Sequence, residues 1–142
     1  MTRMTRDQAM AKLAAGIEAD LAASTTLLEL LERQFDAALR HRSAQLAELA
    51  ELLMPALEAM EQRRVQRVSL VRALVGADGD MAKLIAGLAE PKRAAMAAAW
   101  QALEQMVLEC KRLNARNSAL LTEQFSIMQR VLHGEEEIYA PR

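Results

Sequence analysis

Aromatic residues make up only 3% of this 142-residue chain, which also holds one cysteine, five glycines and three prolines. A single cysteine excludes an internal disulfide framework. Few Gly and Pro residues leave few places for turns, and no segment shows the sustained apolar–polar alternation of a β-strand. No run approaches the ~20 apolar residues of a membrane-spanning helix. These absences favour one soluble, cytoplasmic domain built from long helices.

The charges are balanced, and the residues typical of catalytic or metal sites are scarce. Eighteen basic and 19 acidic residues are interspersed and give a net charge of −1, so no field attracts nucleic acid or anionic lipid. Neither His41 nor His133 has an acid three residues before it, as a di-metal helical bundle requires. No histidine is near Cys110 in sequence, and a buried structural role is expected for this thiol. We therefore expect no catalytic site, no metal site and no cofactor.

Three long segments carry apolar residues at alternating steps of three and four. This heptad spacing is typical of helices that pack side by side. We expect long helices at about 7–39, 44–75 and 91–133, and a short helix at about 80–88. The fold class predicted is all-α: an elongated antiparallel bundle of three long helices with a short helix in the second connection. It would form a single domain over residues 1–142, with a flexible tail from about residue 134.

Several single residues predict where these helices begin, bend or end. Asp7, Ser43 and Asp80 precede periodic segments and are expected as N-caps. Pro55 lies inside the second pattern, where a missing backbone donor predicts a kink. Gly134 follows the last periodic residues and predicts the end of the final helix.

The C-terminal segment carries the most regular pattern of the chain. Its seam consists of Met96, Ala99, Leu103, Met106, Cys110, Leu113, Asn117, Leu120, Gln124, Ile127 and Val131. A second stripe flanks it: Leu121, Phe125, Met128 and Leu132. The apolar face is therefore widest near the end of the helix, which predicts a partner chain there. The amides Asn117 and Gln124 have two interpretations: they fix the register of a bundle, or they hydrogen-bond the backbone of a bound peptide.

The segment from Cys110 to Leu121 resembles the signature of the FlgN family of flagellar type III export chaperones. That signature is a helical Leu-Asn-x-x-Asn-x-x-Leu-Leu or a close variant, followed by an apolar helix and a tail tyrosine. The matching residues are Leu113, Asn114, Asn117, Leu120, Leu121 and, in the tail, Tyr139. The first half of the chain is also similar to the family, whereas Ser118 stands where the family commonly has glycine.

The resemblance implies a cytoplasmic chaperone for hook-filament junction proteins of the FlgK and FlgL type. Such a chaperone captures their C-terminal helical segments, prevents premature assembly and delivers them to the export gate protein FlhA. We expect Tyr139 to dock onto the export gate. The residues expected to bind the client are Leu113, Asn114, Asn117, Leu120, Leu121, Gln124, Phe125, Met128, Val131 and Leu132. Two alternatives stay open: a scaffolding coiled coil whose C-terminal stripe is a homo-oligomer interface, and another secretion adaptor.

Overall fold

The computed structural model describes residues 4–139, with side chains described as far as Gly134. Its four helices are α1 (Arg6–Leu39), α2 (Ser43–Val75), α3 (Met81–Ala86) and α4 (Lys92–Tyr139). Over this part of the chain no residue forms a β-strand. The predicted all-α class, with three long helices and one short one, is therefore confirmed for the described residues.

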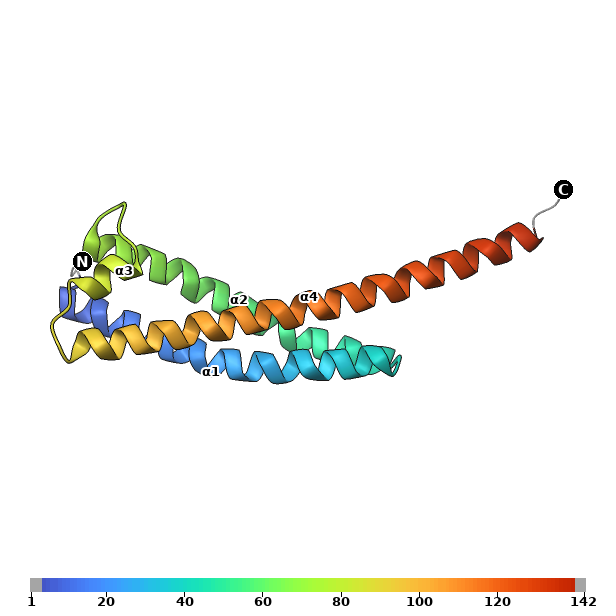
Figure 1. The fold of residues 1–142 in the computed structure, drawn as a ribbon, viewed down its shortest axis with the longest axis horizontal. Coiled ribbons are helices and arrows are strands. Elements are labelled where there is room, and N and C mark those ends of the chain that lie inside the picture. The colour runs from blue at the N-terminus through green and yellow to red at the C-terminus, as the bar shows by residue number, and fades with distance from the viewer. Residues whose placement is uncertain (1–3, 140–142) are drawn as a thin grey trace.

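Helix α1 contacts both other long helices, and the three together form an elongated molecule (Figure 1). Both α2 and α4 pack along α1, while the short α3 joins the far end of α2 to the start of α4. No Cα atom of α2 lies within 8 Å of one in α4 among the described residues. The three long helices thus form an open arrangement, in which α2 and α4 each pack on α1 while their own backbones stand apart.

The start of α1 is fixed by a capping box. The backbone N–H of Gln8 donates to Thr5 Oγ1 at 3.1 Å, and the N–H of Thr5 donates to Gln8 Oε1 at 2.9 Å. The predicted N-cap at Asp7 is therefore wrong. Asp7 lies in the first turn instead, where its carboxylate is favourably placed near the positive end of the helix dipole.

A tight turn joins α1 to α2. His41 adopts a left-handed backbone conformation with φ of 55°, and the N–H of Arg42 donates to the Ala37 carbonyl at 2.9 Å. Arg42 is the N-cap of α2 and makes no side-chain capping bond. Ser43 is the first residue of the helix, so its predicted role as the cap is wrong.

Pro55 lies inside α2, and the helix continues through it to Val75. The proline therefore does not end the helix, and the kink expected there stays a prediction. Asp80 is the N-cap of α3, as predicted, and its Oδ1 accepts a hydrogen bond from the N–H of Lys83 at 2.9 Å.

Helix α4 does not end at Gly134, and the predicted stop there is wrong. The helix continues to Tyr139. Glycine inside a helix costs only about 1 kcal/mol relative to alanine, and three glutamates with good helix propensity follow it. The tail expected from residue 134 is thus helical as far as Tyr139, and residues 140–142 lie outside the described part of the chain.

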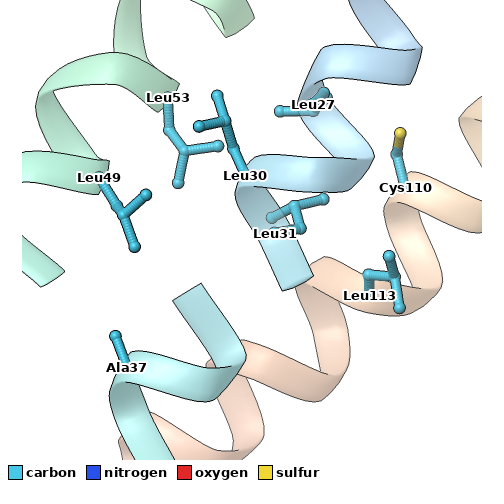
Figure 2. Packing of buried hydrophobic residues seen from close by; sticks show 8 residues of the cluster. All are labelled: Leu27, Leu30, Leu31, Ala37, Leu49, Leu53, Cys110 and Leu113. Atoms are coloured by element: carbon cyan, nitrogen blue, oxygen red, sulfur yellow. The ribbon is translucent and has the colours of Figure 1, made fainter. Parts of the chain in front are cut away.

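The core is aliphatic and forms two clusters along α1. Near the α1–α2 turn, side chains of three helices meet (Figure 2). This cluster contains Leu27, Leu30, Leu31 and Ala37 of α1, Leu49 and Leu53 of α2, and Cys110 and Leu113 of α4. The second cluster lies toward α3 and contains Leu13, Ile17, Val71, Met81, Leu84, Met96 and Leu103. All three long helices contribute to both clusters, and α1 is the helix that packs against both of the others.

Candidate functional site

The last part of α4 projects beyond the turn that joins α1 to α2 (Figure 1). Every residue from Phe125 to His133 is exposed, and we call residues 125–133 the overhang. Its large apolar side chains are Phe125, Ile127, Met128, Val131 and Leu132, with exposed fractions between 45% and 58%. Contiguous apolar surface of this kind marks interaction sites on soluble proteins. The overhang is therefore the first candidate functional surface.

The amides just before the overhang are occupied by the fold itself. Asn117 is 1% exposed, and its Nδ2 donates to the Leu31 carbonyl at 2.7 Å and to Gln34 Oε1 at 2.8 Å. Gln124 Nε2 donates to the Ala38 carbonyl near the end of α1 at 2.9 Å. These bonds fix how α4 lies along α1, which supports the register interpretation of both amides.

The other residues of the expected client site fall into three environments. Leu113 is 3% exposed and belongs to the core cluster shown in Figure 2. Leu120 and Leu121 are half-buried beside the overhang, while Asn114 is exposed. The structure thus brings the predicted residues onto one helix but divides them between core, border and free surface. The side chain of Tyr139 lies outside the described residues.

A second surface, which the sequence patterns did not predict, lies between α2 and α4. It is a groove with α1 as its floor and a volume of about 1190 Å³, and we call it the central groove. Its apolar lining includes Leu53, Leu57, Met60, Val68 and Val71 of α2 and Trp100, Leu103, Val107 and Leu108 of α4. The groove exists because α2 and α4 diverge, a relation that no single helix pattern encodes.

On the floor and on part of the rim of the central groove, charged residues are paired within the protein. Asp20 on the floor has a side chain only 2% exposed and pairs with Arg63 and Arg67 of α2. Arg67 also lies over the ring of Trp100, 5.4 Å from its centroid. On the rim, a hydrogen bond from Arg64 lowers the pKa of the exposed Glu61 carboxyl. The floor can therefore be covered by apolar groups without leaving a buried charge unpaired.

The thiol in the lining of the central groove is made less reactive by its surroundings. Cys110 contributes the only thiol of the chain, and its Sγ lies 3.9 Å from the Ser24 carbonyl. Burial, helped by the Glu109 carboxylate, raises the pKa of this thiol, which lowers its thiolate fraction and hence its reactivity. The described residues contain no group of three or more His, Cys, Asp or Glu side chains placed to hold a metal ion.

Comparison with known proteins supplies the family. The family model described as FlgN protein matches residues 4–133, which cover α1, α2, α3 and all of α4 up to the end of the overhang. A search of curated proteins and a search of solved structures each returned no match. None of the helices described is both long enough and apolar enough to cross a membrane. The chain belongs to the FlgN family, the chaperones of flagellar protein export.

Proposed function

We propose that this protein is the export chaperone of hook-filament junction proteins of the FlgK and FlgL type, and that the overhang captures their C-terminal helical segments. The main support for this proposal is the exposed apolar face of residues 125–133, which the other helices of the chain do not cover. Family membership supports the class of client, because FlgN proteins bind flagellar hook-associated proteins.

The geometry of the overhang suits an amphipathic helix as its ligand. Phe125, Met128 and Leu132 follow each other at steps of three and four, so they lie along one side of α4. An apolar stripe on a client helix can pack against this side, as in other helix-to-helix recognition. Full burial of each such side chain contributes about 1.5–3 kcal/mol. Ordering the client consumes part of that gain, so binding is firm enough to mask the segment and weak enough to release it.

Capture also accounts for the prevention of premature assembly. A client segment held along α4 has its apolar face covered and cannot pair with other subunits. Delivery requires a second contact, and we assign it to Tyr139, which follows the overhang by six residues and ends α4. In this proposal Tyr139 docks onto the export gate FlhA once the client is bound.

The capture step is tested with the double variant Phe125→Ser/Met128→Ser. Both side chains are at least half exposed, so the variant keeps its helicity and thermal stability while its affinity for the client segment falls by at least about tenfold. The matched control is Gln129→Ser/Arg130→Ser, which changes two exposed polar residues of the same helical turns. Calorimetry with a client C-terminal peptide measures affinity, and circular dichroism measures folding.

Two results would contradict the proposal. Unfolding of the Phe125/Met128 variant would mean that these side chains stabilise the core. A concentration-dependent dimer in light scattering that the same variant abolishes, with client affinity unchanged, would identify the overhang as a homo-oligomer interface and favour the scaffolding alternative.

A further inference from the structure

The wall that α4 contributes to the central groove continues in register into the overhang. Trp100, Val107 and Asn114 line the groove at intervals of seven residues, and the same spacing continues to Leu121 and Met128. Residues seven apart lie on the same side of a packed helix. Even in a straight helix the drift of ~20° per heptad accumulates to only ~40° over the two heptads from Asn114 to Met128, which is small beside the ~100° breadth of an apolar face.

A second row of α4 repeats this relation. Glu104 and Lys111 line the groove, and further steps of seven lead through Ser118 to Phe125 and Leu132. The two rows together place the apolar stripe of the overhang on the side of α4 that forms the groove wall. The two candidate surfaces are thus one face of one helix, bounded by α2 along its first half and open along its second.

The central groove is bordered by three long helices and leaves room for a fourth helix between α2 and α4. Leu27 and Leu31 of α1 belong to its floor, and Leu57 of α2 and Leu108 of α4 lie along its walls. The wall residues Leu57 and Leu108 are 46% and 60% exposed, so the walls keep apolar surface that no other part of the protein covers. The α4 wall from Trp100 to Asn114 is about 21 Å long, which is the length of four helical turns.

We propose that the bound client continues from the overhang into the central groove, where an amphipathic helix of the client completes a four-helix arrangement with α1, α2 and α4. This inference rests on the proposed function. The client is favoured as occupant because the groove wall is continuous with the proposed capture surface. From Trp100 to Leu132 the shared face is about 48 Å long, so it accommodates a client helix of about 32 residues.

Trp100 provides the direct test, because it is the only tryptophan of the chain and lines the groove. It lies about 37 Å along α4 from Phe125, which is too far for contact with a client confined to the overhang. The probe is a tryptophan-free synthetic peptide of the C-terminal helical segment of the FlgK-type client. We expect its addition to shift the Trp100 emission, with saturation at the peptide concentration that saturates binding in calorimetry.

Substitutions locate the contact. Leu57→Ser/Leu108→Ser is expected to weaken peptide binding by about tenfold and to abolish the Trp100 response. The control Leu52→Ser/Met54→Ser removes two leucine-sized side chains that are 55% and 57% exposed and do not line the groove. This control retains both the affinity and the fluorescence response, and circular dichroism establishes that each variant is folded.

The outcomes separate this inference from the proposed function. Suppose that the overhang variant loses binding, and that saturating peptide leaves the emission of Trp100 unchanged in the unmodified protein. The proposed capture by the overhang is then supported and the groove contact is refuted. This conclusion does not depend on whether the groove variant folds. If the overhang variant binds normally, the proposed function fails first. If the groove variant only converts a dimer into a monomer and binds peptide normally, a second copy is the occupant and the inference is overturned.

Discussion

The buried carboxylate of Asp20 on α1 accepts a hydrogen bond from Arg67 on α2 at 2.7 Å, while its other oxygen accepts one from Arg63. Arg67 in turn lies over the ring of Trp100 on α4. One acid and two bases thus connect the three long helices at the floor of the central groove. The cluster joins α2 to α1 directly, through two ion pairs, and reaches α4 through the contact of Arg67 with Trp100.

Asp20→Ala is expected to destabilise the protein strongly. The substitution removes the carboxylate that pairs with Arg63 and Arg67, whose side chains are just 25% and 13% exposed. Breaking a buried pair by removing one partner costs about 3–5 kcal/mol, and the partial exposure of Arg63 places the expected loss toward the lower limit. Urea unfolding followed by circular dichroism measures the change in the free energy of unfolding.

Asp36→Ala is the control for that experiment. It removes an ion pair with Arg40 in which both side chains are more than half exposed, and such surface pairs contribute at most about 1 kcal/mol. Similar losses for the two variants would show that the Asp20 cluster is no more stabilising than a surface pair.

Asn117→Ala is expected to lower the free energy of unfolding by about 1–3 kcal/mol, because it removes two hydrogen bonds of a buried side chain, to the Leu31 carbonyl and to Gln34 Oε1, each of which contributes about 0.5–1.5 kcal/mol. Asn114→Ala, on the exposed side of the same helix, should change stability by less than about 0.5 kcal/mol. Thermal unfolding compares the two. If the Asn117 variant keeps the stability of the unmodified protein but binds the client poorly, the alternative in which this amide contacts the bound peptide is favoured.

Cys110 should be alkylated slowly in the folded protein. Burial raises the pKa of its thiol, so at any pH below that value the thiolate fraction is smaller than in the unfolded chain, and only the thiolate reacts. We expect the iodoacetamide reaction at pH 8 to be several-fold slower without urea than in urea, as measured by mass spectrometry. Equal rates would show that the thiol is accessible and unperturbed.

Tyr139→Ala separates delivery from capture. If Tyr139 docks onto the export gate, the variant keeps its melting temperature and its affinity for the client peptide, while the loaded complex binds the cytoplasmic domain of FlhA more weakly. Calorimetry measures both affinities, and Ile138→Ala is the neighbouring control. Normal binding to FlhA would refute the docking role, whereas a large drop in melting temperature would show that the ring packs on the helices.

Sequence patterns were sufficient for the long helices but not for their mutual arrangement. Heptad spacing identified all three because an apolar seam is a local property of each helix. One seam per helix, however, does not reveal that α1 packs against both α2 and α4. This packing of α1 depends on contacts between residues far apart in the chain, which a local pattern does not contain.

The same limit applies to the candidate site. The exposed stripe of the overhang was predictable, because Phe125 and Met128 widen the face of α4 beyond what one seam requires. The central groove was not, since it depends on the divergence of α2 and α4. Its one local signal was the seven-residue spacing that links Trp100 and Val107 to Leu121. At the start of α1, the capping-box pair Thr5 and Gln8 is a stronger signal than the single acid Asp7.

The length of α4 beyond the α1–α2 turn also has a kinetic consequence. From Lys92 to Gln124 the helix is held by neighbouring side chains. The overhang depends mainly on its own backbone hydrogen bonds, and isolated helices of that length are only marginally stable. Amide protons in one continuous helix should therefore exchange with solvent at very different rates, slowly around Leu103 and quickly after Phe125. A binding partner that laid a helix on the overhang would slow exchange there first, so deuterium uptake along α4 would record both where the partner sits and how far it extends.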